Sequence, residues 1–187
     1  MSARPRAFSA TRPGAWAVRF ASEKHGIVLR EGGFEDIAIR PASFQAVTMV
    51  DFIEHTPRPA AAVAKAFSIL APGGILCLVT PDIHSRLALG SGRPWRCRSG
   101  RRWWHLRPGH VAYFSRESLR VLLEEAGFRI LDHRRYAWTF SLHYLVSRLK
   151  PLRAFTRIRA SFFLRRIPIK LSLGDSFEIY AVKDGTA

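Results

Sequence analysis

The chain has 187 residues, of which 30 are lysine or arginine and 14 are acidic, so its formal net charge is +16. This length favours a single domain, and 48% hydrophobic residues are enough for a folded core. Two cysteines exclude a disulfide framework, and no apolar run approaches the roughly 18 residues that span a bilayer, so we expect a cytoplasmic protein.

The N-terminus, MSARPRAFSATRPGAWAVRF, is basic, contains serine and has no acidic residue before Glu23. Such a composition is typical of a mitochondrial transit peptide. The favoured interpretation is a disordered tail from an unusual start site, which we place at residues 1–16. Residues 17–187 are then expected to form the folded domain, beginning with a helix in AVRFASEKHG at 17–26.

A strand, a helix and a second strand follow one another in residues 44–82, FQAVTMVDFIEHTPRPAAAVAKAFSILAPGGILCLVTPD. Phe44–Met49 is apolar and rich in strand formers, which predicts a strand covered on both faces. Ala60–Leu70 is rich in helix formers, and the Pro-Gly-Gly turn after it leads into a strand at Ile75–Thr80. A strand–helix–strand unit of this length predicts a right-handed parallel crossover.

Polar residues follow both predicted strands. Asp51, Glu54 and His55 come directly after the first strand, and residues 81–84 come after the second. Ligands of open α/β sheets bind beyond the carboxyl ends of the strands. We therefore expect the binding site at residues 51–55 and 81–84.

Two further segments extend the α/β pattern. Ser115 has the position of a helix N-cap, and the apolar residues after it keep a helical spacing up to Gly127. A strand is expected at Phe128–Arg135, and a final strand in FEIYAVKDG at 177–185.

Four features follow one another within residues 18–183. They are the Asp-x-x-Glu-His turn, the Leu-x-Pro-Gly-Gly turn, the segment HLRPGHVAYFSRESLRVLLEEAGF at 105–128 and the final strand. As an ordered set they resemble the class I S-adenosylmethionine-dependent methyltransferases, and above all small-molecule and quinone-type O-methyltransferases. The resemblance implies an α/β, Rossmann-like fold with a mostly parallel sheet and an antiparallel final strand. It also implies S-adenosylmethionine as the cofactor.

Two features of that family have no counterpart here. The family's first strand carries a glycine-rich loop for the methionine end of the cofactor, and its second strand ends in an acid that binds the ribose. Residues 1–16 contain only Gly14, so we expect an N-terminally truncated domain that lacks the first two strands. Its third strand, at about Gly26–Gly32, would have no neighbour, and Phe44–Met49 would form an exposed edge that a partner chain or a second copy covers.

Methyl transfer from a sulfonium needs an aligned acceptor and a group that takes the acceptor's proton. His55 and His110 are the candidate bases, because imidazole titrates near neutral pH; helix capping and core packing are their alternative roles. Asp51 is expected to orient an acceptor hydroxyl or to contact the cofactor. By resemblance, Glu35 and Asp36 match the acidic site that holds the adenine amino group. The cofactor contacts implied by the resemblance are Glu35, Asp36, Met49, Val50 and Asp51.

The insertion at 83–114 contains seven arginines, three tryptophans and no acid. Arginine interleaved with tryptophan is typical both of a substrate lid and of a surface that stacks nucleic-acid bases. Its position in the family favours the lid. Cys97, His105 and His110 do not have the spacing of a zinc site, so we expect no metal site.

A second basic insertion, residues 137–170, keeps an apolar stripe at helical spacing among arginines. This pattern predicts an amphipathic helical hairpin that contacts an anionic membrane surface through residues 139–166. The alternative is a helical cap over the active site, and a lipid-like acceptor would reconcile the two.

Three functions remain open on these grounds. The first is S-adenosylmethionine-dependent methyl transfer to a small-molecule or lipid-like acceptor, impaired by the missing glycine loop. The second is a methyltransferase-like binding module that has lost its cofactor. A nucleic-acid-binding protein ranks last, because the chain has no recognised RNA-binding motif.

Overall fold

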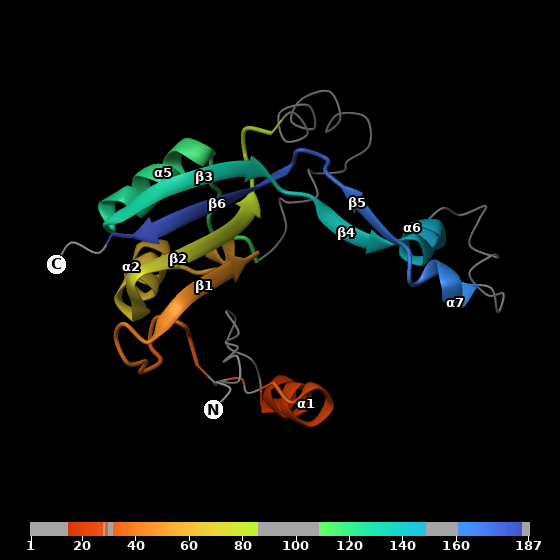
Figure 1. Cartoon of the computed structure of the whole chain (residues 1–187), viewed down its shortest axis with the longest axis horizontal. Coiled ribbons are helices and arrows are strands. Elements are labelled where there is room, and N and C mark those ends of the chain that lie inside the picture. The colour runs from red at the N-terminus through yellow and green to blue at the C-terminus, as the bar shows by residue number, and fades with distance from the viewer. Residues whose placement is uncertain (1–14, 28, 30–31, 86–108, 149–160, 185–187) are drawn as a thin grey trace.

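The computed structural model describes residues 15–27, 29, 32–85, 109–148 and 161–184 (Figure 1). In chain order the elements are α1 Ala15–His25, β1 Phe44–Val50, the 3-10 helix η1 Ile53–His55, α2 Pro59–Ile69, β2 Leu70–Pro81, α5 Arg116–Glu125, β3 Phe128–Arg135, β4 Trp138–Ser141, α6 Leu142–Arg148, α7 Ser161–Leu164, β5 Pro168–Leu171 and β6 Ser176–Lys183. No helix in these ranges is long and apolar enough to cross a membrane.

Four strands form the main sheet, in the order β1-β2-β6-β3. β1 and β2 pair in parallel, with Val47 opposite Leu76. β6 runs antiparallel to both β2 and β3. The parallel crossover and the antiparallel final strand predicted from the sequence are therefore confirmed, and the fold is α/β and Rossmann-like.

β1 lies at the edge of the sheet, as predicted. The third strand expected at about Gly26–Gly32 is wrong for the part of that segment that the structure describes, because residues 26, 27, 29 and 32 lie in no strand. Gly26 ends α1 with φ +64°, and Gly32 has φ +124°. These left-handed conformations interrupt an extended chain and suit glycine. α1 begins at Ala15, so the last two residues of the predicted tail are helical, and residues 1–14 lie outside the described ranges.

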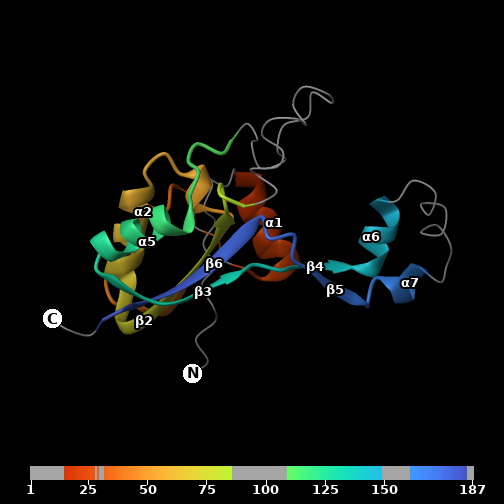
Figure 2. The same ribbon diagram turned by 90° about the horizontal axis from the view of Figure 1, so that it is seen from above.

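α2 and α5 pack on the same face of the sheet, where the core lies (Figure 2). Leu78 and Phe177 from the sheet and Leu119 from α5 are fully buried there. Along β1 the pattern differs from the prediction of a strand covered on both faces: Met49 is 4% exposed, whereas Val50 is 48% exposed. Successive strand residues point to opposite faces, so β1 in this structure has one covered face and one open face.

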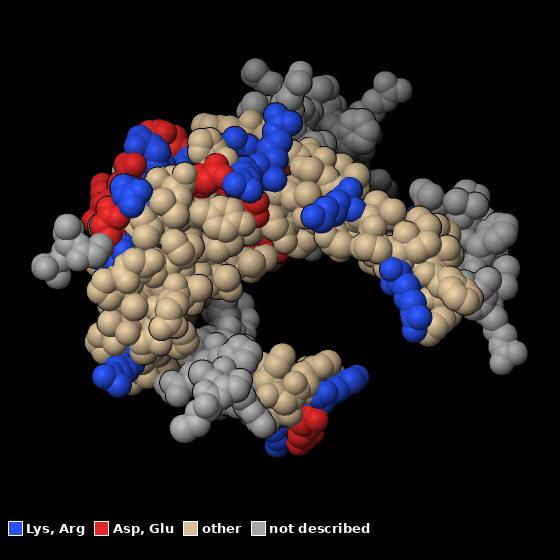
Figure 3. Space-filling model, viewed as in Figure 1, with Lys and Arg blue, Asp and Glu red and all other residues tan. Residues whose placement is uncertain are grey.

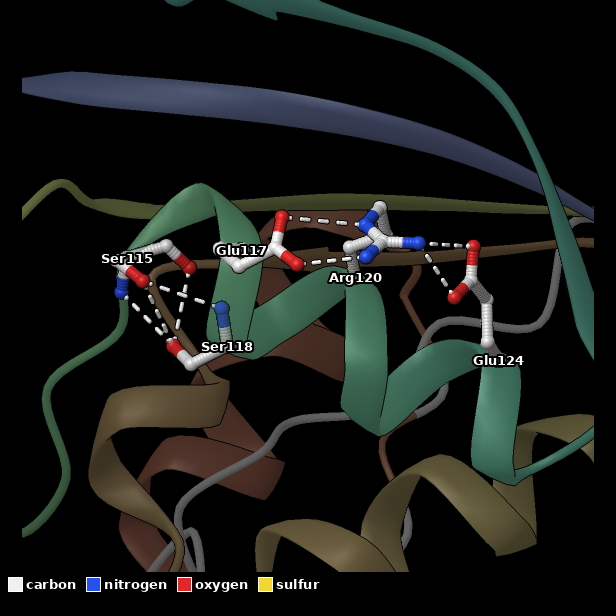
Figure 4. A network of polar contacts seen from close by, with 5 residues as sticks. All are labelled: Ser115, Glu117, Ser118, Arg120 and Glu124. Carbon is white, nitrogen blue, oxygen red and sulfur yellow. Dashed lines mark hydrogen bonds and ion pairs between the residues drawn. The ribbon is translucent and has the colours of Figure 1, made fainter.

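The N-terminus of α5 confirms the predicted cap (Figure 4). The Ser115 hydroxyl accepts a hydrogen bond from the Ser118 N–H at 3.1 Å, and the Ser118 hydroxyl accepts one from the Ser115 N–H at 2.9 Å. Such a reciprocal pair satisfies two donors that a helix start otherwise leaves open. On the exposed face Arg120 bridges Glu117 and Glu124, one turn away on either side.

The turn between α2 and β2 is tighter than expected. α2 ends at Ile69, one residue before the predicted end at Leu70, and β2 begins directly at Leu70 rather than at Ile75. The pairing of β1 with β2 shifts register between Phe44 and Ala46, where the Pro-Gly-Gly segment lies opposite. Gly73 takes φ +75° within it, and this conformation lets the chain enter the strand without a loop.

The insertion before β6 is an arm that extends away from the main sheet (Figure 1). β4 and β5 pair antiparallel, with Trp138 opposite Leu171, and α6 and α7 lie against each other at its far end. The prediction of a helical hairpin over 137–170 is therefore wrong at both ends. Trp138–Ser141 is rich in β-branched and aromatic residues, which favour a strand. Residues 149–160 lie outside the described ranges.

Candidate functional site

A tight polar turn follows β1. Asp51 adopts a left-handed backbone with φ +49°, and its N–H donates to the carbonyl of Val79 at 3.0 Å. This conformation is uncommon for a residue other than glycine and holds the turn beside the carboxyl end of β2. Phe52 and Ile53 are buried, so the turn is anchored in the core and presents Asp51 and His55 at its edge.

The segment that leads into α5 is attached to this turn. The N–H groups of Val111 and Ala112 donate to the carbonyl of Glu54 at 2.8 and 3.2 Å. Nδ1 of His55 lies 2.8 Å from the carbonyl oxygen of Gly109. A carbonyl only accepts, so Nδ1 carries the proton of this hydrogen bond, and Nε2 of the neutral ring is left as an acceptor.

These hydrogen bonds bring together three side chains from two distant parts of the sequence. Glu54, His55 and His110 each offer one ligand-type atom, and these atoms all lie within 4.8 Å of one another. The rings of His55 and His110 meet edge to face, with 4.6 Å between their centroids. The two histidines predicted as bases are thus neighbours, while their role in catalysis stays a prediction.

Glu54 is the functional candidate that sequence reasoning missed. Its side chain is 2% exposed, Oε2 accepts a hydrogen bond from the Thr80 hydroxyl at 2.9 Å, and Oε1 has no hydrogen-bond partner among the described residues. Burial raises the pKa of Glu54, the Thr80 hydrogen bond opposes this shift, and the charge of Asp51 adds to it. The signal available in the sequence was the glutamate directly before the histidine of the turn.

The charge of Asp51 acts both on this cluster and on the start of the arm. Its charge contributes to the raised pKa of Glu54. It also contributes to the raised pKa of Tyr136, after partial burial of that phenol. Tyr136 connects β3 to the arm, and its N–H donates to the carbonyl of Ser176 at 3.0 Å. The base of the arm therefore lies close to the candidate site.

The acidic segment predicted to bind adenine is tied to the same turn. Phe34 is buried and packs edge to face on Phe52, with 5.7 Å between ring centroids. The carboxylate of Glu35 accepts a hydrogen bond from the Thr56 hydroxyl, and Asp36 forms an ion pair with Arg58 at 2.8 Å. Both carboxylates thus have partners within the chain, and contact with adenine stays a prediction for them.

Two predicted cofactor contacts differ in exposure. Met49 is buried in the core, whereas Val50 is exposed beside Asp51 at the open face of β1, and cofactor contact stays a prediction for both. Asp82, in the predicted segment 81–84, is 7% exposed and accepts a hydrogen bond from the His84 N–H at 2.9 Å. Arg116 lies 3.4 Å from its other oxygen, so Asp82 links the start of α5 to the end of β2.

Part of the predicted site cannot be placed. Residues 86–108 of the predicted lid, with Cys97 and His105, lie outside the described ranges. The described ends of that insertion contribute His110 to the cluster. What the site offers is therefore an acceptor nitrogen on His55, a second imidazole and a buried carboxylate, a set able to take a proton or to hold a divalent cation.

An α/β sheet with its polar cluster beyond the carboxyl ends of two parallel strands defines a class of ligand-binding enzymes. Residues 6–133 match the family described as "Methyltransferase domain", and the chain belongs to this family. A probable S-adenosylmethionine-dependent methyltransferase of Mycolicibacterium smegmatis is 30% identical over 104 residues, which are 56% of this chain and 36% of that protein. A ubiquinone biosynthesis O-methyltransferase of Xanthomonas campestris is 47% identical over 47 residues, 25% of this chain and 20% of that protein.

The chain spans about a third of the first of these curated relatives and a fifth of the second.

Solved structures share the fold over most of the chain. A methyltransferase from Thermotoga maritima aligns with a TM-score of 0.57 at 20% identity, over 95% of this chain and 72% of that one. The structure of a methyltransferase from Bacillus halodurans aligns with a TM-score of 0.55 at 20% identity, over 95% of this chain and 81% of that one.

Proposed function

We propose that the chain takes part in S-adenosylmethionine-dependent methyl transfer to a small-molecule or lipid-like acceptor. The cluster of His55, His110 and Glu54 beyond the carboxyl ends of β1 and β2 carries this proposal. S-adenosylmethionine supplies an electrophilic methyl group on a sulfonium, so the protein has to align the acceptor and receive its proton. Membership of the methyltransferase family supports the reaction class.

Each residue of the cluster has a distinct part in this proposal. Nε2 of His55 takes the acceptor's proton, because Nδ1 is engaged with the Gly109 carbonyl. His110, edge to face on that ring, holds the acceptor oxygen or nitrogen in line with the methyl group. Asp51 contacts the cofactor from the turn after β1, next to the exposed side chain of Val50.

Titration of the purified chain with S-adenosylhomocysteine in a calorimeter is the first test. We expect a dissociation constant between the micromolar and the millimolar range, because the end of β1 is present while the family's glycine-rich loop has no counterpart in the sequence. The Asp51→Asn variant should bind more weakly, and the Glu117→Gln variant, changed on the outer face of α5, should bind as the parent does. An absence of heat at millimolar ligand would favour the alternative of a methyltransferase-like module without a cofactor.

One observation favours a second arrangement of the same reaction. Oε1 of Glu54 is buried without a hydrogen bond to any described residue, and it belongs to a group with two imidazoles in ligand range. The hydrogen bond from His55 Nδ1 to a backbone carbonyl is of the kind that orients histidine ligands. In this arrangement Glu54, His55 and His110 hold a divalent cation, which positions the acceptor oxygen.

Removal of metal separates the two arrangements. We expect dialysis against a chelator to abolish methyl transfer if the cation positions the acceptor, and added Mn²⁺ or Mg²⁺ to restore it. If the imidazoles act directly as base and anchor, the chelated protein should keep its activity. Binding of S-adenosylhomocysteine is the control in both cases, because the cluster lies on the acceptor side of the proposed site.

A further inference from the structure

We propose that the arm, meaning residues 138–148 and 161–173, docks on the surface of an anionic lipid bilayer. This interaction surface goes beyond methyl transfer and does not depend on it. The surface is built from exposed apolar side chains and unpaired positive charge on one projecting element.

The arm concentrates exposed apolar side chains. Of the thirteen large hydrophobic side chains that are exposed in the described ranges, six lie on it: Tyr144, Phe162, Phe163, Ile167, Leu171 and Leu173. Phe163 is 69% exposed and Phe162 55%, and α6 has no buried residue at all. A cluster of this kind on a small element marks an interaction site, because single exposed apolar residues are scattered on ordinary surfaces.

Its charge has one sign. From His133 to Gly174 the sequence holds ten arginines or lysines and no acidic residue. The described part of the arm accordingly shows lysine and arginine and no acid (Figure 3). Five of the described arginines in the main body form ion pairs with carboxylates, as Arg58 does with Asp36 and Arg120 with two glutamates. On the arm no carboxylate is available to Arg148, Arg165 or Arg166 from the arm's own sequence.

The cations lie directly beside the exposed aromatic rings. The guanidinium of Arg166 is 4.7 Å from the centroid of the Phe162 ring, and that of Arg148 is 4.9 Å from the Tyr144 ring. An aromatic ring that enters the headgroup region then brings its arginine to the level of the lipid phosphates. This pairing suits a bilayer interface, where apolar and anionic surfaces meet within a few ångströms.

Charge and side-chain chemistry decide among the occupants. A second copy of the arm would bring the same positive charge against itself, which is unfavourable. Nucleic acid would match the charge, but the aliphatic side chains of Ile167, Leu171 and Leu173 offer no base stacking. An anionic bilayer satisfies both components. The base of the arm at Tyr136 lies near Asp51, so docking would bring the candidate site close to the lipid surface.

Flotation of the full chain with phosphatidylcholine vesicles, with and without phosphatidylglycerol, tests the proposal. We expect binding only to vesicles that contain phosphatidylglycerol, and weaker binding at moderate than at low salt. The double variant Phe162→Ser/Phe163→Ser should bind about tenfold more weakly at both salt concentrations. The double variant Arg165→Gln/Arg166→Gln should bind more weakly at low salt and show a smaller salt dependence than the parent chain.

Val121→Ser on α5 and Leu131→Ser on β3 are matched controls, because they remove exposed apolar side chains from the main body. They should bind vesicles as the parent chain does, and thermal unfolding should show that all variants fold. The proposal is overturned if the parent chain does not float with anionic vesicles, or if the arm variants and the body variants bind equally. Arm variants that change only the oligomeric state in gel filtration, or only binding to RNA, would overturn it as well.

Discussion

Replacing either histidine of the cluster is expected to reduce methyl transfer strongly while leaving the fold intact. His55→Ala removes both the acceptor nitrogen and the hydrogen bond to Gly109, and His110→Ala removes the ring that packs on it. Loss of a positioned proton acceptor costs about 10²- to 10⁴-fold in rate. We expect this loss in kcat/KM for each variant, measured with an acceptor identified by screening the parent chain.

The controls distinguish a catalytic role from a structural one. His133→Ala changes an exposed residue of β3, so its activity should remain close to that of the parent chain. Binding of S-adenosylhomocysteine should be unchanged in all three variants. The expectation fails if His55→Ala and His110→Ala bind the cofactor product normally and keep activity within about threefold, since a positioned base contributes far more than that.

The framework of the site was predictable because each of its elements is encoded locally. The apolar segments around β1 and β2 and the cap at Ser115 are read from neighbouring residues, and the structure confirms them in kind, although the predicted Pro-Gly-Gly turn lies within β2. Their order predicted the parallel crossover, because a strand, a helix and a strand can return to one sheet only in a few ways. That crossover is what places the turn after β1 beside the end of β2.

The site itself depends on contacts that the sequence does not encode locally. The Glu54 carbonyl receives hydrogen bonds from Val111 and Ala112, more than 50 residues away, and this pairing brings His110 to His55. Burial of Glu54 accompanies the same docking, so a residue of the predicted binding turn to which the sequence assigned no role became part of the cluster. The prediction of two covered faces on β1 failed for a related reason, since hydrophobicity alone does not indicate which neighbours a strand will have.

The arm shows where a predicted helical segment was extended too far. Its apolar residues keep a helical period from Leu142 to Phe162, and α6 lies in that range, whereas β4 and β5 lie before and after it. Short segments contain too few turns for periodicity to separate the two states, and the cross-strand partners of Trp138–Ser141 lie about 30 residues further along the chain. Only the far end of the arm, in α6 and α7, keeps the helical character that the sequence predicted.

Glu54→Gln is expected to stabilise the protein at neutral pH while it impairs the site. The pKa of Glu54 is raised chiefly by burial, so the folded protein binds a proton more tightly at this carboxyl than the unfolded chain does. The free energy of unfolding therefore falls as the pH rises through the folded-state pKa of Glu54, and the cost remains at neutral pH. A neutral amide avoids this cost and can still accept the hydrogen bond from Thr80, so we expect the free energy of unfolding of the variant to exceed that of the parent chain near pH 8.

The pH dependence makes this prediction specific. The advantage of Glu54→Gln should shrink as the pH is lowered toward the unfolded-state pKa of a glutamate, because the parent chain then carries a neutral side chain as well. Urea unfolding at several values between pH 5 and 8 measures it. Glu117→Gln is the control, because the pKa of Glu117 is shifted in the opposite direction. Arg120 lowers that pKa, so the replacement should give no gain in the free energy of unfolding at neutral pH. If the Glu54→Gln variant is less stable than the parent at pH 8, a partner in the folded state compensates the charge of the carboxylate. If the variant is more stable and fully active, Glu54 has no role in the site.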